Sequence, residues 1–413
     1  MSSILTNFSP TQVGQFSTAQ IHALTAADWA GLSTAQAQAL NSTQIAAITP
    51  SAIVAISSTA IAALGSSQVP GLTSAELGTL TSTQVSALDT ADLSSTQLGA
   101  LSVSAVSGLT TADINALSTT QLAGLTAKEV GSLSSAQIGA LSSIQVPALS
   151  SGQLGALSAN QYAALGTALT SSQLSFLSTT TVGGLSTAAV NALTSTQVPG
   201  LTAAQVAALN SAQVNALNTS TLTSTQLGAL SAGGLVGLST ADINAFSNTQ
   251  LGGLTAKEVT ALSSAQVGAL SSSQAAGLSS TQLAAFTSSQ LGSLNVAGLS
   301  SSQLGSFTAT AVSGLTTADM AALSSTQLPG FTGKQFAALS TALVDAIVSS
   351  QIQYLSTSEV SSLTTGQIQS LSTGQVQSFS TSQLATLAYA QVAALSSTQM
   401  AALSSTQIQA LVV

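Results

Sequence analysis

One octapeptide, L-S/T-x-x-Q-V/I/L-x-A/G, is repeated through nearly the whole chain and restricts its fold more than any other feature. Residues 134–141 (SSAQIGAL) and 396–403 (SSTQMAAL) are two copies. A short fixed period predicts a solenoid, in which each repeat contacts only its neighbours. We therefore expect one continuous array over residues 1–413 rather than several globular domains.

Each repeat carries a complete signal for the start of a helix. We number positions from the residue after Leu, so that position 1 is Ser or Thr, position 4 is Gln, Glu or Asp, position 5 is Val, Leu or Ile, and position 8 is Leu. Ser or Thr followed three residues later by Gln or Glu is a capping box, and the preceding Leu with position 5 forms a hydrophobic staple. The next start arrives eight residues later, so each helix has one to two turns, roughly 10 Å. This predicts an all-α solenoid of very short capped helices with positions 5 and 8 in the core and positions 2, 3 and 6 mostly exposed.

Charged residues and prolines test this interpretation. Asp89 lies at position 1 and Asp345 at neither capping position, while the remaining carboxylates lie at position 4, where a helix start favours negative charge: Asp28, Glu76, Asp92, Asp113, Glu129, Asp242, Glu258, Asp319 and Glu359. Pro10 and Pro50 lie at position 2, the first helical residue. Four prolines lie at position 6, inside the predicted helix, where proline is costly: Pro70, Pro147, Pro199 and Pro329. They predict either a tight, irregular second turn or extended residues, and the second possibility leaves a β-solenoid as the alternative fold.

Four short repeats interrupt the octads, at residues 89–93, 166–169, 218–222 and 295–299. They are interpreted either as corners or phase corrections of the superhelix, or as relics of a segmental duplication. A duplication is visible because the segment beginning at Thr110 reappears at Ser239.

Composition excludes several classes of function. Only 3% of residues are charged, against roughly a quarter in ordinary proteins. Three Lys and no Arg give no electrostatic footprint for nucleic acid. Polar residues recur in every repeat, so no run approaches the roughly 20 apolar residues of a transmembrane helix. The first residues lack a basic segment and a long apolar one, so no Sec signal peptide is expected. The surface is expected to consist of Ser, Thr and Gln side chains, with little charge to oppose association.

No constellation of catalytic, cofactor-binding or metal-binding residues is apparent, and the chain is expected not to be an enzyme. His22 lies at position 6 with no nucleophile pattern beside it, and Lys128 and Lys257 are interpreted as solvated charges. Capping explains the carboxylates, which lack the clustering of a calcium loop. Trp29 and Tyr162 occupy position 5 and are expected in the core.

The octad resembles the repeat arrays of large bacterial secreted and surface proteins, often labelled adhesins. This resemblance implies an extracellular or cell-surface location and no defined catalytic activity. Together with the repeat still intact at 404–411 and the apolar Val412 and Val413, it predicts a structural protein that assembles with itself into a filament or surface layer through uncapped solenoid ends. The alternatives are a monomeric stalk or adhesin that binds a surface or glycan, and a protein that binds ice or crystal surfaces.

Overall fold

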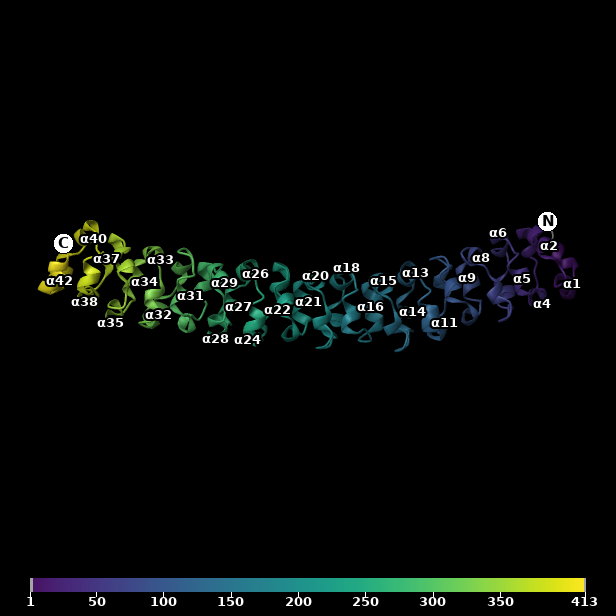
Figure 1. Cartoon of the computed structure of the whole chain (residues 1–413), viewed down its shortest axis with the longest axis horizontal. Helices are drawn as coiled ribbons and strands as arrows, with labels where there is room; N and C mark the ends of the chain where they lie inside the picture. Colours follow the sequence, from purple (N-terminus) through teal and green to yellow (C-terminus); the bar gives the residue numbers. More distant parts are fainter. Residues whose placement is uncertain (1–2, 412–413) are drawn as a thin grey trace. The chain divides into compact units, whose positions relative to one another are not determined.

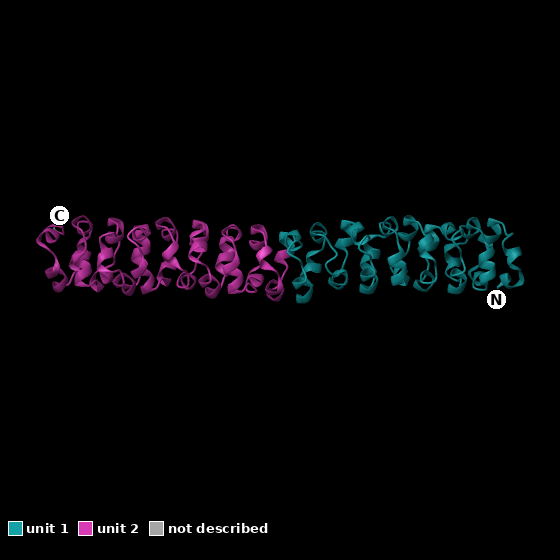
Figure 2. Cartoon of the chain, turned by 90° about the horizontal axis from the view of Figure 1, so that it is seen from below, with its two compact units in different colours: residues 1–205 teal, residues 206–413 magenta. Residues whose placement is uncertain are grey.

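The computed structural model describes residues 3–411. The chain forms two compact units, residues 1–205 and 206–413 (Figure 2). Within each unit, short helices wind in stacked turns (Figure 1). No strand occurs between residues 3 and 411, so the all-α solenoid is confirmed and the β-solenoid is wrong. The single array over residues 1–413 stays a prediction.

The α-helices have four to seven residues each. Those of the first unit are α1 (Pro10–Val13), α2 (Thr18–Ala23), α3 (Ala26–Trp29), α4 (Thr34–Ala39), α5 (Ser42–Ile45), α6 (Pro50–Ile53), α7 (Ser58–Ile61), α8 (Ser74–Leu77), α9 (Ser82–Val85), α10 (Ser95–Leu98), α11 (Thr111–Ala116), α12 (Thr119–Leu122), α13 (Ala127–Ser132), α14 (Ser135–Gly139), α15 (Ser151–Gly155), α16 (Ala159–Leu165), α17 (Ser171–Leu174), α18 (Thr179–Gly183) and α19 (Thr187–Asn191). The chain divides within α20 (Ala203–Ala207).

Those of the second unit are α21 (Ser211–Ala216), α22 (Ser224–Leu227), α23 (Ala232–Leu235), α24 (Thr240–Ala245), α25 (Asn248–Leu251), α26 (Ala256–Ala261), α27 (Ser264–Gly268), α28 (Ser272–Ala276), α29 (Ser280–Ala284), α30 (Ser288–Leu291), α31 (Ser301–Leu304), α32 (Thr317–Ala322), α33 (Gly333–Ala338), α34 (Thr341–Asp345), α35 (Ser349–Ile352), α36 (Thr357–Ser361), α37 (Thr365–Ser370), α38 (Thr373–Gln377), α39 (Thr381–Leu384), α40 (Tyr389–Ala393), α41 (Ser397–Ala402) and α42 (Ser405–Ala410).

Interspersed 3-10 helices are η1 (Ile4–Asn7), η2 (Val69–Gly71), η3 (Thr90–Asp92), η4 (Val106–Gly108), η5 (Val146–Ala148), η6 (Val198–Gly200), η7 (Thr219–Thr221), η8 (Val296–Gly298), η9 (Ala311–Gly314) and η10 (Leu328–Gly330). All four prolines at position 6 lie in such helices, η2, η5, η6 and η10. The tight second turn is therefore the correct one of the two predicted conformations.

The capping box predicted for each repeat is present in most of them. At α15, the Ser150 hydroxyl accepts a hydrogen bond from the Gln153 N–H at 3.3 Å, and Gln153 Oε1 accepts from the Ser150 N–H at 2.9 Å. Pro10 and Pro50 occupy the starts of α1 and α6, as predicted. Two N–H groups that a free helix end would leave without partners are thus satisfied within eight residues.

The core follows the predicted positions. In the repeat 134–141, Ile138 at position 5 and Leu141 at position 8 are buried, while positions 2, 3 and 6 are exposed. Each helix packs against the helix three repeats further along, as α1 does against α4 and α33 against α36. Small residues at positions 6 and 7 allow this approach, since a Cβ on Gly124 would lie 2.1 Å from the Ser95 carbonyl oxygen.

Candidate functional site

Glutamine at position 4 joins successive turns of the solenoid. Gln153 is 2% exposed, and its Nε2 donates to the Leu122 and Leu125 carbonyl oxygens at 2.9 and 2.8 Å. These acceptors lie 31 and 28 residues earlier, at positions 5 and 8 of the fourth preceding repeat. One amide therefore caps its own helix with the oxygen and binds the previous turn with the nitrogen. We call this arrangement the glutamine staple.

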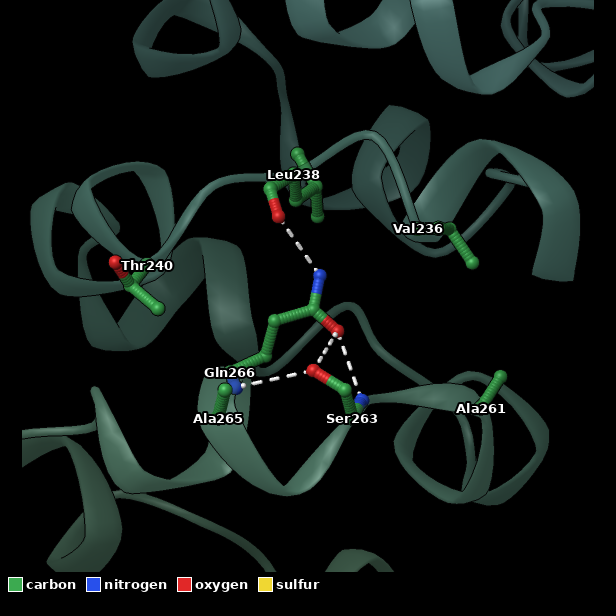
Figure 3. Close-up of a pocket in the computed structure, with 7 residues that line it drawn as sticks. All are labelled: Val236, Leu238, Thr240, Ala261, Ser263, Ala265 and Gln266. Atoms are coloured by element: carbon green, nitrogen blue, oxygen red, sulfur yellow. Dashed lines mark hydrogen bonds between the residues drawn. The ribbon is translucent and has the colours of Figure 1, made fainter.

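The staple recurs in both units. In the second unit, Gln266 accepts from the Ser263 N–H at 2.8 Å and donates to the Leu235 and Leu238 carbonyl oxygens, both at 2.8 Å. Figure 3 shows the Gln266 side chain extended between the Ser263 and Leu238 backbones. Because helices pack at an interval of three repeats and staples reach back four, one superhelical turn takes between three and four repeats.

The short repeats keep the staple in register. Gln97 reaches across the five-residue repeat 89–93, and its acceptors, Val69 and Leu72, lie 28 and 25 residues earlier. They still occupy positions 5 and 8 of the fourth preceding repeat. Across the four-residue repeat 166–169, Gln173 likewise donates to Val146, 27 residues earlier. A short repeat therefore counts as one whole repeat in the spacing of the staple.

The staple corrects the expectation that glutamine amides form the surface. The surface prediction is wrong for most glutamines at position 4, because their Nε2 donates to carbonyl oxygens buried between turns. Most glutamines at this position are less than 9% exposed. The sequence carries a signal for this role, since a capping box accepts Gln or Glu equally, yet the chain strongly prefers the residue that can also donate.

The burial of a carboxylate at position 4 depends on the length of its side chain. Four aspartates cap their helices at the surface, namely Asp28, Asp113, Asp242 and Asp319, whereas η3 is capped by Asp89 rather than by Asp92. At Asp28 the Thr25 hydroxyl and the Ile4 N–H hold the pKa of the carboxyl below its ordinary value. The glutamates are buried: Glu76, Glu129, Glu258 and Glu359. Burial raises the pKa of Glu76, and it raises the pKa of Glu359 to about 7.

The other candidate residues of the sequence do not form a common site. His22 and Lys128 are exposed, and Trp29 and Tyr162 lie in the core as predicted. Among residues 3–411, no group of three or more His, Cys, Asp or Glu side chains could hold a metal ion. The predicted lack of enzymatic activity stays a prediction.

A surface groove of about 270 Å³ lies above the Gln266 staple (Figure 3). Its lining consists of small and aliphatic side chains beside one staple: Val236, Leu238, Thr240, Ala261, Ser263, Ala265 and Gln266. Val236 is 71% exposed, and the groove contains no titratable group. The groove therefore offers mainly methyl groups beside the polar groups of one staple.

The last turn of the described chain opens its apolar face. Val392, Leu395 and Met400 at positions 5 and 8 are partly exposed, and Ile408 is 39% exposed. The equivalent Val376, one turn earlier, is fully buried. The carbonyl oxygens of Leu395 and Leu403, which a staple would reach, accept no hydrogen bond within residues 3–411.

The first turn of the described chain presents glutamine amides in place of open carbonyls. Gln12 and Gln20 cap α1 and α2 through Oε1, as interior glutamines do. Both side chains are exposed, and neither Nε2 donates to an acceptor in the described part of the chain. Gln36, one turn later, has acceptors in the Leu5 and Phe8 carbonyls. The sequence did not reveal this donor face, because its recognition requires the number of repeats per turn.

No helix within residues 3–411 has the length and apolar character needed to cross a membrane. A family model described as the ALTTAQ repeat matches residues 130–167 and 167–203, and no curated protein matches the chain. Among solved structures, the leucine-rich repeat-containing protein LegL7 from Legionella pneumophila has 13% identity and a TM-score of 0.11, covering 64% of this chain and 78% of that one. So low a TM-score gives no information about the fold. Two adjacent matches show a repeat array that is similar to the ALTTAQ repeat over residues 130–203.

Proposed function

We propose that this chain is a non-enzymatic structural protein whose copies stack end to end into an extracellular filament or surface layer. The observation that carries the proposal is the complementarity of its two open turns. Within residues 3–411, one turn presents the amides of Gln12 and Gln20 without acceptors, and the other presents the carbonyls of Leu395 and Leu403 without donors beside uncovered apolar side chains.

Hydrogen bonding gives the contact a defined register. If repeat 404–411 of one copy directly precedes residues 1–8 of the next, which count as one repeat for the Gln36 staple, the fourth repeat before that of Gln12 is 388–395. Gln12 then meets the Val392 and Leu395 carbonyls of the other copy, and Gln20 meets those of Met400 and Leu403. The junction would repeat the staple found throughout the interior, so the second copy needs no new kind of contact.

Apolar burial and low charge favour the same association. The partly exposed Val392, Leu395 and Met400 would be covered by the first turn of the next copy, and each fully buried side chain contributes about 1.5–3 kcal/mol. A net charge of −8 over 413 residues opposes stacking only weakly. Because the two faces differ, the contact is heterologous and generates open filaments.

An extracellular location is supported by the resemblance of the octad to repeat arrays of secreted and surface proteins. It is tested by fractionating the producing cells and detecting the chain in the medium, at the surface or in the cytosol. Exclusive recovery from the cytosol would contradict this part of the proposal and leave the assembly unaffected.

Assembly itself is tested with the 413-residue chain by sedimentation velocity over micromolar concentrations and by negative-stain microscopy. We expect concentration-dependent species and filaments one solenoid wide. A stable monomer at every concentration, with no filaments, would reject assembly and favour the monomeric stalk.

The register is tested by the double substitution Gln12→Ala and Gln20→Ala. Losing four staple hydrogen bonds of about 1 kcal/mol each should weaken association by roughly a hundredfold or more. The matched control is Gln15→Ala with Gln38→Ala, which changes two exposed glutamines outside position 4 and should leave assembly unchanged. Filaments of normal length from the first variant would show that the copies associate through another surface.

A further inference from the structure

Two glutamates occupy the place of a stapling glutamine and cannot staple while ionised. Glu359 and Glu76 are both 0% exposed, and in each one carboxylate oxygen makes the capping contact. Glu359 Oε2 accepts from the Ser356 N–H at 2.5 Å, and Glu76 Oε2 from the Thr73 N–H at 2.5 Å. The other oxygen, Oε1, is buried without a hydrogen-bond partner in both residues. It stands where glutamine carries its donor.

Neighbouring staples identify the missing acceptor of Glu359. One repeat earlier, Gln351 Nε2 donates to the Leu323 carbonyl at 2.6 Å, and one repeat later Gln367 Nε2 donates to the Leu339 carbonyl at 2.8 Å. The equivalent carbonyl for Glu359 is that of Phe331. No hydrogen bond within residues 3–411 reaches the Phe331 carbonyl oxygen.

The same reasoning applies to Glu76. Gln68 donates to the Leu40 carbonyl at 2.6 Å, and Gln84 donates to the Ile56 carbonyl at 2.9 Å. The intervening acceptor is the Ile48 carbonyl oxygen, which accepts no hydrogen bond in the described part of the chain. At both sites an acceptor of the previous turn is thus left without its donor.

No cation compensates a charge at either site. Of the helices packed on α36, α33 carries the exposed Lys334, which forms no ion pair with Glu359, and α39 carries no titratable residue. Of those packed on α8, neither α6 nor α10 carries one. The repeats that hold Phe331 and Ile48 have none either. An ionised carboxylate here would be buried against carbonyl oxygens, which is costly.

We propose that Glu359 and Glu76 act as proton-dependent staples: the neutral acid donates its Oε1–H to the Phe331 or Ile48 carbonyl, and loss of that proton releases the contact between turns. The proton is exchanged with solvent, and no other bond changes. In the acid form each glutamate matches glutamine, because one oxygen accepts and the other donates. At high pH the array is weakened at these two places.

The direction of the pH dependence follows from burial. Because burial raises the pKa of Glu359 from 4.5 to about 7, its stabilisation is complete below pH 4.5 and is lost as the pH rises through about 7. The pKa of Glu76 is raised for the same reason, so its contribution falls in the same direction. The equilibrium constant for opening the repeats around Glu359 should rise by up to about tenfold per pH unit within that interval.

The test compares Glu359→Gln with Gln367→Glu over pH 4 to 9. Opening is measured by hydrogen exchange of peptides from residues 328–375, corrected for intrinsic exchange rates. We expect Glu359→Gln to remove the pH-dependent opening at this site and to protect it at pH 8. Gln367→Glu should create the same dependence one repeat later, because Gln367 is 1% exposed and staples Phe336 and Leu339.

A direct measurement keeps the proposal testable if a variant folds poorly. The chain has only four glutamates, Glu76, Glu129, Glu258 and Glu359, so 13Cδ-glutamate labelling with solid-state NMR follows each of them in filaments or monomers. Two carboxyl signals should remain in the acid form above the ordinary glutamate pKa and should disappear in Glu76→Gln and Glu359→Gln. Signals that all titrate near the ordinary value, or a pH dependence of exchange in residues 328–375 that survives Glu359→Gln, would overturn the proposal.

Discussion

Both ends of one amide are used at position 4, and this explains why the repeat is written with glutamine. The oxygen completes a capping box, which is a local contact and can be predicted from three residues of spacing. The nitrogen binds carbonyls 28 and 31 residues away, and no local pattern specifies that distance. The sequence therefore predicts the cap and the core, but it cannot predict the staple without the number of repeats per turn.

Replacing a stapling glutamine by an isosteric apolar residue should measure the staple alone. Gln153→Met keeps the side-chain volume but removes the bonds to Leu122, Leu125 and Ser150. Buried carbonyl and N–H groups left unpaired should cost about 2–4 kcal/mol, measured by denaturant unfolding monitored by circular dichroism. Gln15→Met, at an exposed position, should change stability by less than about 0.5 kcal/mol. Equal effects of the two substitutions would refute the structural role of the staple.

Helices of four to seven residues are too short to persist alone, so their stability comes from contacts with the turns on either side. The closeness of those contacts is visible only in the structure. Proline at position 6 suggested a tight second turn but left an extended segment possible, and the choice depends on how adjacent backbones pack. Glycine is required where a carbonyl of a neighbouring turn leaves no room for a Cβ, and at Gly166, whose φ is +59°.

Two glycine-to-alanine substitutions should therefore change the stability of the chain in opposite directions. A Cβ on Gly124 would lie 2.1 Å from the Ser95 carbonyl oxygen, whereas one on Gly152, within α15, would meet nothing within 4 Å. Gly152→Ala should stabilise the chain by about 0.5–1 kcal/mol, because alanine loses less backbone entropy in a helix. Gly124→Ala should destabilise the chain, because the backbone at Ser95 would have to move to make room for the new Cβ. Thermal unfolding measures both, and a stabilising Gly124→Ala would show that the turns are less closely packed.

At the scale of the molecule, every described contact within a unit is local in repeats. Packing reaches three repeats and stapling reaches four, so stability should be a sum of neighbouring terms rather than a property of one core. The eight-residue period and the capping box in each repeat sufficed to predict an all-α solenoid. The division near residue 205 has no counterpart in the sequence pattern, because the repeat continues through it.

A buried charge at one core position should accordingly open only its surroundings. Leu262 is 5% exposed, and its carbonyl accepts the Gln290 staple at 2.8 Å. Leu262→Asp should abolish hydrogen-exchange protection within about four repeats on each side. Residues 1–205 should keep the protection of the parent. Uniform loss of protection along both units would contradict the neighbour-limited description.

Register counted in repeats rather than in residues has a consequence for how such a gene changes. Recombination between near-identical copies of the repeat adds or removes repeats. A truncated repeat such as 89–93 counts as a whole repeat in the spacing between a glutamine and its acceptors. After such an event, each interior glutamine would still have positions 5 and 8 four repeats back, so we expect the shortened or lengthened product to fold. The number of repeats should therefore be able to change without a compensating mutation elsewhere in the chain.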